Sequence, residues 1–168
     1  MSQEKFTFFW GYPSPFSNWY QPCTFTLDNC TYNCSEQFLM AEKARMFNDA
    51  EALDAIMKAA HPREQKQLGR LVKNFVKDPW NKIAKRIMYR GCFAKFQQNP
   101  SLLKALLDTV GTTLVEASPT DKIWGIGLKE DDPRAQSRDT WLGTNWLGET
   151  LTSVRNDLQG HTNDRQII

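Results

Sequence analysis

The stretch "SEQFLMAEKA", residues 35–44, predicts a helix whose apolar face carries two charged groups. At about 100° per residue, one arc of roughly 120° holds the apolar side chains of Leu39, Met40, Met46 and Phe47. Glu36 and Lys43 fall in the same arc, two helical turns and about 10.5 Å apart along the axis. That distance is long for a direct ion pair, and it suits two groups that reach one ligand from the same wall.

Each of these two charges has a chemical and a structural interpretation. A Lys43 amine surrounded by apolar side chains loses hydration, which lowers its pKa and favours attack on a carbonyl-type carbon. Alternatively, Lys43 extends its ammonium past the apolar stripe into water. Glu36 either moves protons for the amine or closes a capping box in "NCSE", with Asn33 as the N-cap. The helix pattern leaves both interpretations open.

The rest of the chain predicts a mainly helical α+β fold. With 168 residues and 40% hydrophobic content, the chain can form one compact domain with a few short strands. Strands are expected in 5–10, 23–32 and 112–118, and helices in 33–47, 49–60, 63–75, 78–98, 100–110 and 145–158. Residues 125–143 predict a loop. The domain is expected to span 1–158, followed by a tail at 159–168.

Composition argues against several classes of protein. The sequence has no run of about 18 apolar residues and no signal-peptide layout, so we expect a cytoplasmic or nucleo-cytoplasmic protein that does not bind membranes. Cys23, Cys30, Cys34 and Cys92 lack paired CxxC spacing, and only two histidines accompany them. We therefore expect reduced thiols and no metal site.

Positive charge is concentrated in one third of the chain. Between Lys58 and Lys95 there are 11 Lys and Arg against two acids, a local net charge of +9, although the whole chain carries only +2. Such a belt suits a phosphate-bearing ligand or a nucleic acid, while two ordinary solvated basic helices are the structural alternative. No GxxxxGK[ST] or strand-linked GxGxxG motif is present to bind phosphate.

Other candidate ligand groups lie in turn-rich motifs. These are Asn18 in "FSNW", Trp80 in "DPW", Asp121, Trp124 and Gly125 in "DKIWGIG", and Asn145 in "TNWLG". Aromatic rings beside amide and carboxylate groups suit a planar base or a sugar, and the Gly-x-Gly allows close approach to the backbone. Core packing explains any single Trp equally well, and Asn145 is also a candidate N-cap of the last helix.

Taken in order, the motifs "FSNW", "SEQFLMAEKA", "LGR", "DPW", "AKF", "LVEAS…DxxWGxG" and "NWLG" resemble the NADAR family of YbiA-like N-glycosidases. The resemblance covers roughly residues 8–158. It implies a compact, mostly helical fold and cleavage of N-glycosidic bonds of phosphorylated riboses. Implied substrates are ADP-ribose attached to guanine, free or in DNA or RNA, and early riboflavin-pathway intermediates. The loop from Lys129 to Thr140 and the chain after Leu158 match no family motif.

The resemblance also implies roles for individual residues. Lys43 becomes the nucleophilic amine, Glu36 the acid/base carboxylate and Asp121 a second catalytic or orienting group. Trp80 and Trp124 become walls of the pocket. The implied contacts to sugar or phosphate come from Asn18, Arg70 and Asn145, with Gly125 at the substrate.

These roles combine into one expected mechanism, in which Lys43 forms a Schiff base with the opened ribose. It needs no cofactor and no metal. The expected partner is an ADP-ribose-type nucleotide or an ADP-ribosylated nucleic acid, and the expected state is a monomer. The alternatives are the same chemistry on aminouracil ribose phosphates, or a binding module for ADP-ribose that has no catalytic activity.

Overall fold

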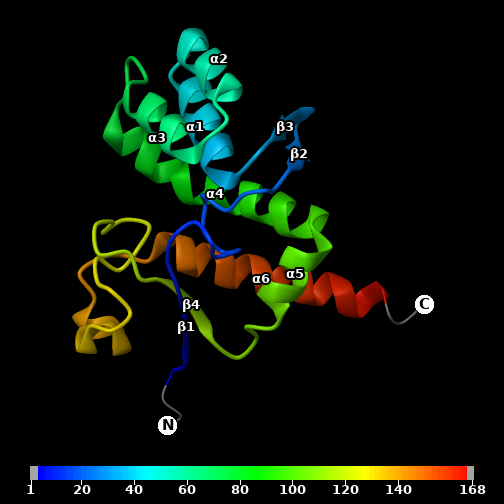
Figure 1. The fold of residues 1–168 in the computed structure, drawn as a ribbon, viewed down its shortest axis with the longest axis vertical. Coiled ribbons are helices and arrows are strands. Elements are labelled where there is room, and N and C mark those ends of the chain that lie inside the picture. Colours follow the sequence, from blue (N-terminus) through cyan, green and yellow to red (C-terminus); the bar gives the residue numbers. More distant parts are fainter. Residues whose placement is uncertain (1–3, 166–168) are drawn as a thin grey trace. The chain divides into compact units, whose positions relative to one another are not determined.

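The computed structural model describes residues 4–165, which form six α-helices, two short 3-10 helices and four short strands (Figure 1). In chain order these are β1 Phe6–Phe9, β2 Phe25–Leu27, β3 Cys30–Tyr32, α1 Ser35–Met46, α2 Ala50–Lys58, α3 Pro62–Arg70, α4 Lys77–Gln98, α5 Pro100–Leu107, β4 Thr113–Glu116, η1 Pro133–Gln136, η2 Arg138–Thr140 and α6 Trp146–Arg165. The predicted mainly helical α+β class is confirmed. The described part of the chain contains no helix that is long and apolar enough to cross a membrane.

The chain divides into two units. The central unit is Asn18–Asn99, and the terminal unit joins the residues up to Ser17 with those from Pro100 onward. The last helix continues to Arg165, so the predicted domain end at Leu158 falls inside α6. That boundary stays a prediction.

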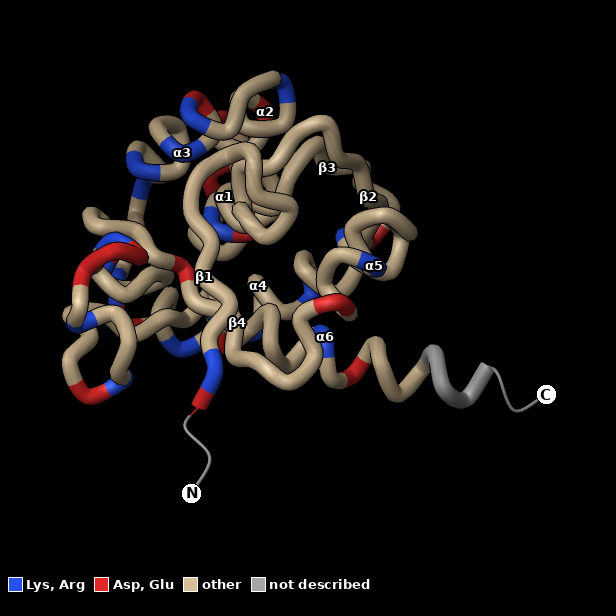
Figure 2. The backbone as a smooth tube through the Cα atoms, turned by 60° about the horizontal axis from the view of Figure 1, so that its bottom comes forward, with Lys and Arg blue, Asp and Glu red and all other residues tan. Residues whose placement is uncertain are grey.

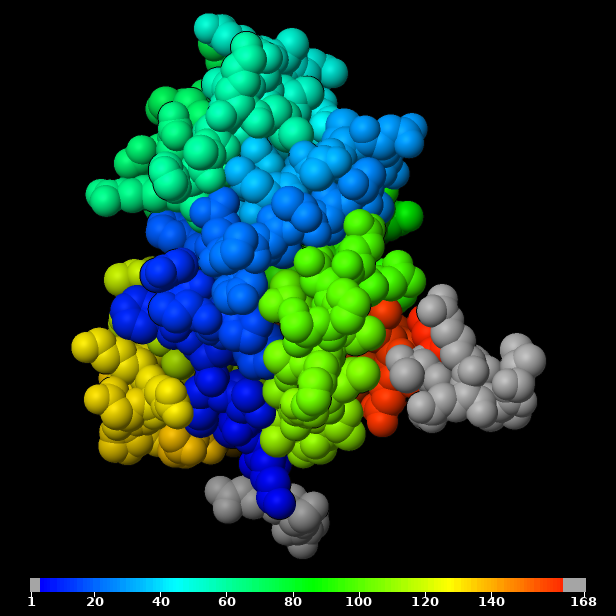
Figure 3. Space-filling model, turned by 45° about the vertical axis from the view of Figure 1, so that its right-hand side comes forward, coloured from blue at the N-terminus to red at the C-terminus, as the bar shows by residue number. Residues whose placement is uncertain are grey.

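In the central unit, α1 is the buried helix. It contacts α2, α3, α4 and β3, and every residue from Ser35 to Ala41 is buried. The prediction of a single apolar face is therefore wrong, because neighbours cover the first half of α1 on several sides. Figure 3 shows α2 and α3, coloured cyan to green, at the surface of this unit.

The start of α1 differs from the predicted capping box. Cys34, not Asn33, is the N-cap, and its side chain makes no capping bond. The backbone N–H of Asn33 donates to Gln37 Oε1 at 2.8 Å, while the N–H of Glu36 donates to Asn18 O at 3.0 Å. The side chain that reaches back to the backbone before α1 is therefore that of Gln37, one residue after the predicted Glu36.

Close packing between α1 and α4 depends on a glycine. A Cβ built on Gly91 would lie 2.4 Å from Phe38 Cδ1, so any side chain there would displace a fully buried ring. Phe38 in turn packs edge-on against Tyr32 of the β2–β3 hairpin, with ring centroids 5.1 Å apart. The hairpin turns at Asp28 and Asn29, both with positive φ, which divides the single strand predicted at 23–32.

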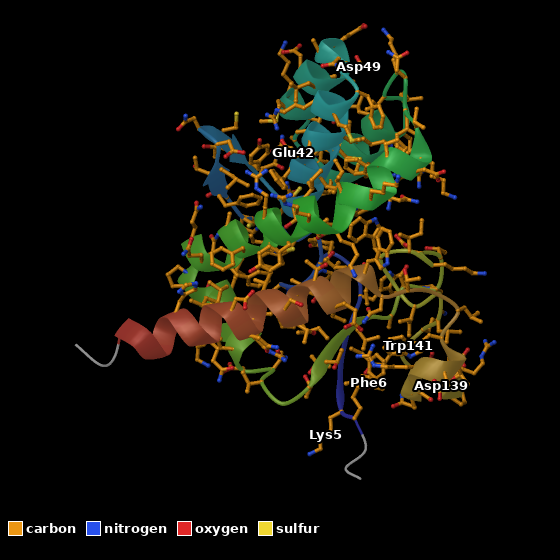
Figure 4. The ribbon with its side chains drawn as sticks, turned by 180° about the vertical axis from the view of Figure 1, so that it is seen from behind. Lys5, Phe6, Glu42, Asp49, Asp139 and Trp141 are labelled. Atoms are coloured by element: carbon orange, nitrogen blue, oxygen red, sulfur yellow. The ribbon has the colours of Figure 1, made fainter. Side chains whose placement is uncertain are left out.

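The terminal unit is built on the parallel pair β1 and β4, in which Phe6 pairs with Thr113 and Phe9 with Glu116. One face of the pair packs on a cluster formed by Val115, Ile126, Leu128 and Ala135. Trp141 covers this cluster beside Phe6, with ring centroids 5.3 Å apart (Figure 4). The predicted loop at 125–143 therefore contributes core residues as well as the two 3-10 helices.

Candidate active site

The predicted site residues fall into two sets, one in each unit. The central unit holds Asn18, Glu36, Lys43, Arg70 and Trp80, and the terminal unit holds Asp121, Trp124, Gly125 and Asn145. Within the central unit, α1 supplies the amine and its carboxylate, and α3 supplies the guanidinium.

Lys43 is half-buried, and its Nζ lies 4.0 Å from the centroid of the Phe75 ring. Burial lowers the pKa of the Lys43 amine, the negative charge of Glu36 raises it, and the positive charge of Arg70 lowers it. None of the ion pairs among residues 4–165 includes Lys43. The environment therefore favours the neutral, nucleophilic form of this amine more than water does.

Glu36 is 5% exposed, and its Oε2 accepts a hydrogen bond from Trp19 Nε1 at 3.3 Å. Trp19 also lies near a cation, since Lys66 Nζ is 5.8 Å from its ring centroid. The electrostatic effect of Glu36 on Lys43 shows that the carboxylate and the amine influence each other along α1. A carboxylate and an amine in this relation can exchange protons through a bound ligand or a water molecule.

Asn18 presents an unsatisfied acceptor at the start of α1. Its backbone carbonyl accepts from the Glu36 N–H, which fixes the residue, yet its side-chain Oδ1 is buried and has no hydrogen-bond partner within residues 4–165. Ser35 Oγ is likewise buried and has no hydrogen-bond partner within residues 4–165. A buried polar atom without a partner costs about 1–3 kcal/mol, so both atoms are suited to a ligand hydroxyl or an ordered water. Ser35 carries no such signal in the sequence, because a serine at a helix start usually indicates capping.

Arg70 and Trp80 are placed differently from each other. Arg70 is the exposed last residue of α3, and its effect on the pKa of Lys43 places its charge within electrostatic reach of the amine. Trp80 lies in the first turn of α4 and is only 8% exposed. Its burial agrees with core packing, and its predicted role as a pocket wall stays a prediction.

The exposed positive charge between Lys58 and Lys95 is smaller than the sequence count suggests. Lys95 is 1% exposed and so contributes no surface charge. Lys73 and Arg90 are paired with Glu51 and Asp28, at 2.8 and 2.7 Å. Figure 2 colours the Lys and Arg positions of α3 and α4 blue. Those with exposed side chains are Arg63, Arg70, Lys77, Lys82, Lys85 and Arg86.

In the terminal unit, Asp121 holds a turn. Its Oδ1 accepts hydrogen bonds from the backbone N–H groups of Ile123 and Trp124, both at 2.8 Å. This turn presents Trp124 edge-on to Trp146, with ring centroids 5.6 Å apart. The contacts give Asp121 a structural role, and its catalytic role stays a prediction.

Gly125 and Asn145 also make structural contacts. A Cβ on Gly125 would lie 2.9 Å from the carbonyl oxygen of Glu116. The absence of a side chain at Gly125 therefore allows its backbone to pack closely against the backbone of Glu116. Asn145 is fully buried: its Oδ1 accepts from the Glu116 N–H and its Nδ2 donates to the Leu114 carbonyl, each at 3.0 Å. Asn145 thus ties β4 to the start of α6. The substrate contacts predicted for Gly125 and Asn145 stay predictions.

No group of three or more His, Cys, Asp or Glu within residues 4–165 is arranged to hold a metal ion. Cys23, Cys30, Cys34 and Cys92 are free thiols. Burial raises the pKa of the Cys34 and Cys92 thiols to about 12, which disfavours the reactive thiolate. The candidate chemistry in the central unit therefore lies in the amine and the carboxylate of α1.

Comparison with known proteins gives the family. The NADAR domain model matches residues 8–159. The chain is 45% identical over 130 residues to protein irg-1 of Caenorhabditis elegans, covering 76% of this chain and 61% of irg-1, so it spans about three fifths of that relative's length. It is 38% identical over 170 residues to an N-glycosidase of Acanthamoeba polyphaga mimivirus, covering 95% of this chain and 99% of that protein.

Two further likenesses concern a metabolic relative and the fold. The riboflavin biosynthesis protein PYRR of Arabidopsis thaliana is 31% identical over 116 residues, covering 67% of this chain and 18% of PYRR. The solution structure of the E. coli protein YbiA superposes with a TM-score of 0.77 at 24% identity, covering 96% of this chain and 89% of YbiA, which confirms the expected YbiA-like fold. The chain therefore belongs to the NADAR family.

Proposed function

We propose that the chain, an enzyme of the N-glycosidase class, cleaves the bond between ADP-ribose and guanine through a Schiff base on Lys43. The single observation that carries this proposal is the state of the Lys43 amine. It is half-buried, its pKa is lowered by burial, and a buried carboxylate acts on it from the same helix. A module that only binds a nucleotide does not require an amine made more nucleophilic in this way.

The proposed first step exchanges one bond at the anomeric carbon for another. The neutral Lys43 amine attacks C1′ of the ribose, and the C1′–N bond to guanine breaks. Guanine leaves with the bonding electron pair and takes up a proton. We assign the movement of protons to Glu36, because its charge acts on the Lys43 amine from the same helix.

The second step releases the sugar. The C1′–O4′ bond opens, the ring oxygen takes a proton, and the attached nitrogen loses one to form a protonated imine with Lys43. Water then adds to the imine carbon, and breaking the C–N bond returns the amine and an aldehyde sugar in equilibrium with its ring form. This differs from the two-carboxylate scheme of most glycosidases, in which a carboxylate attacks the sugar.

Substrate recognition is proposed for the groups around these two. The unsatisfied Asn18 Oδ1 suits a ribose hydroxyl, which donates a hydrogen bond. Arg70, exposed and within electrostatic reach of Lys43, suits a phosphate of the nucleotide. The exposed cations of α3 and α4 suit a diphosphate, or a DNA or RNA strand that carries the modified base.

The similarity to PYRR favours a second candidate substrate. That relative is named as a riboflavin biosynthesis protein, so the same chemistry on 5-amino-6-ribosylaminouracil phosphates is the alternative. Both substrates present a base linked to C1′ of a phosphorylated ribose. Lys43 and Glu36 keep the same roles in either case.

The experiment incubates the protein separately with ADP-ribosyl-guanosine and with an aminouracil ribose phosphate, and measures the released base by chromatography. We expect guanosine from the first substrate and little aminouracil from the second. Fast release of aminouracil alone would assign the metabolic substrate. Release of neither base, from a protein that still binds ADP-ribose, would leave a binding module and overturn the proposal.

A further inference from the structure

The segment that joins α3 to α4, residues Leu71–Val76, lies against the Lys43 amine through one aromatic ring. Phe75 provides this contact, with its ring centroid 4.0 Å from Lys43 Nζ. Three side chains of this segment are apolar and yet exposed: Leu71 at 75%, Val76 at 54% and Phe75 at 40%. Burial of the Phe75 side chain therefore does not explain why its ring lies against the Lys43 amine.

The segment is fastened by one buried carboxylate, Asp49, which is 7% exposed (Figure 4). Asp49 Oδ1 accepts from the Ala52 N–H at 3.0 Å and caps α2, and its Oδ2 accepts from the Lys73 N–H at 2.8 Å. The Lys73 ammonium adds an exposed ion pair to Glu51 at 2.8 Å. One carboxylate thus fixes the start of α2 and the middle of the α3–α4 segment together.

Two further features direct the ring toward the amine. Asn74 has a φ of 58°, a left-handed conformation that turns the chain between the anchored Lys73 and Phe75. Phe47, just after α1, packs edge-on against Phe75 with ring centroids 5.3 Å apart. The ring is therefore held from its backbone and from its side, in contact with Lys43.

We propose that Phe75 is a positioning residue for the Lys43 amine, and that Asp49 holds it in place. The negative π face attracts the ammonium and does not attract the neutral amine. The ring thus holds the protonated lysine in one position, and loss of the proton releases the amine toward the sugar. The catalytic part of this proposal rests on the proposed function of Lys43; the effect of the ring on the amine does not.

The charges that act on Lys43 have opposite signs. Glu36 on α1 itself favours the ammonium and Arg70 on α3 disfavours it. Among the described residues of the elements packed against α1, Arg70 is the one that contributes a charge to the titration of this amine. Replacing Phe75 leaves both charges in place, so the contribution of the ring can be measured separately.

The test measures how fast each lysine amine of the intact protein reacts with a trace of acetic anhydride across a range of pH, without substrate, by peptide mass spectrometry. The variants are Phe75→Leu, which removes the ring and keeps an apolar side chain, and Phe75→Tyr, which keeps the ring. Leu71→Ala is the matched control, since Leu71 is an apolar side chain of the same segment that carries no ring and is more exposed than Phe75. Lys58 and Lys104, both in exposed ion pairs, serve as internal references.

In Phe75→Leu, we expect the neutral fraction of Lys43 at pH 7 to rise about three- to tenfold, because the ammonium loses its attraction to the ring. Phe75→Tyr and Leu71→Ala should match the wild type. The acid limb of the pH–kcat profile should move to lower pH in Phe75→Leu, because Lys43 loses its proton at lower pH. The pH-independent kcat should stay close to that of the wild type, because the ring does not attract the neutral amine. A Lys43 reactivity curve unchanged in a folded Phe75→Leu protein would overturn the proposal.

The Tyr variant keeps the test decisive if the Leu variant does not fold. A Lys43 curve in Phe75→Tyr that moved further than the curves of the reference lysines vary would also overturn the proposal, since that variant retains the ring. The labelling needs no turnover. If no substrate forms an adduct with Lys43, the proposed function fails while the labelling result on Phe75 still stands.

Discussion

The central unit contains two lysines with lowered pKa values, Lys43 on α1 and Lys95 on α4, in very different surroundings. Lys95 is 1% exposed, and its Nζ lies 5.0 and 5.6 Å from the ring centroids of Phe96 and Tyr20. Burial lowers the pKa of the Lys95 amine, opposed by the nearby thiols Cys92, Cys23 and Cys34. Lys43 is only half-buried, and a carboxylate and a guanidinium act on it.

From this difference we infer that desolvation alone is not enough for the nucleophilic role proposed for Lys43. Both amines have lost hydration, but a substrate carbon can reach only the one that keeps part of its surface exposed. Lys43 also has the Glu36 charge acting on it, whereas thiols act on the titration of Lys95. Exposure of the amine distinguishes the two lysines.

The largest expected effect comes from removing each amine in turn. Lys43→Met should lower kcat by about 10⁴-fold or more, because no other group supplies the nucleophile. Lys95→Met, if folded by circular dichroism, should stay within about tenfold of the wild type, since the amine does not touch the substrate. Base release under saturating substrate is the measurement. An equal loss in both variants would remove the distinction between the two lysines.

The second prediction concerns the two carboxylates of α1. Glu36→Gln should lower kcat by about 10²- to 10³-fold through loss of proton transfer. It should also move the acid limb of the pH–kcat profile to lower pH, because the Glu36 charge raises the pKa of Lys43. Glu42→Gln is the control, since Glu42 pairs with Arg45 and has no assigned role in the chemistry (Figure 4). A profile in Glu36→Gln that moved to higher pH would contradict the account.

A smaller effect is expected at Arg70. Arg70→Gln should raise KM about tenfold through the loss of a charge-assisted contact to phosphate. Because the Arg70 charge lowers the pKa of Lys43, its removal should move the acid limb of kcat to higher pH, opposite to the shift in Glu36→Gln. Arg63→Gln, an exposed change on the same helix, serves as the control for general charge loss. Identical KM values in the two variants would argue against a specific phosphate contact.

The smallest effect is on stability and concerns Lys95. Its folded pKa lies below 10.5, so the unfolded chain binds more protons in the interval between the two values, and stability rises as pH increases toward 10.5. At lower pH the buried ammonium costs on the order of 1 kcal/mol for each unit by which the pKa is lowered. Lys95→Met should lack this contribution.

The measurement is the difference in free energy of unfolding by urea between wild type and Lys95→Met, from pH 7 up to the ordinary lysine pKa of 10.5. This difference largely cancels the titration of the thiols, which both proteins share. We expect the wild type to gain stability relative to the variant as pH rises. A difference that stays constant across this range would mean that Lys95 has an ordinary pKa.

Much of the fold could be predicted from the sequence, because periodicity and turn residues act locally. The helix predicted at 78–98 is found at Lys77–Gln98, and the strand predicted at 112–118 contains β4. The helix predicted at 63–75 ends at Arg70 instead, because Asp49, distant in sequence, binds the Lys73 N–H and Asn74 turns left-handed. Tertiary hydrogen bonds of this kind leave no periodic signal.

The candidate site was predictable to the extent that it lies on one helix. The spacing of Glu36 and Lys43 identified them as unusual, and the structure shows an electrostatic interaction between them. Phe75 and Asp49 were missed, since their relation to Lys43 exists only after α1, α2 and the α3–α4 segment pack together. The burial of Lys95 was also missed, because in a sequence a lysine counts as surface charge.

The central claim is that Lys43 forms a covalent imine with the sugar, and reductive trapping tests it most directly. The protein is incubated with ADP-ribosyl-guanosine and sodium borohydride, digested, and the modified peptide sequenced by mass spectrometry. The account predicts one ribose-derived adduct on Lys43, formed in the wild type and in Lys95→Met and absent from Lys43→Met. An adduct on Lys95, or one that persists in Lys43→Met, would contradict it.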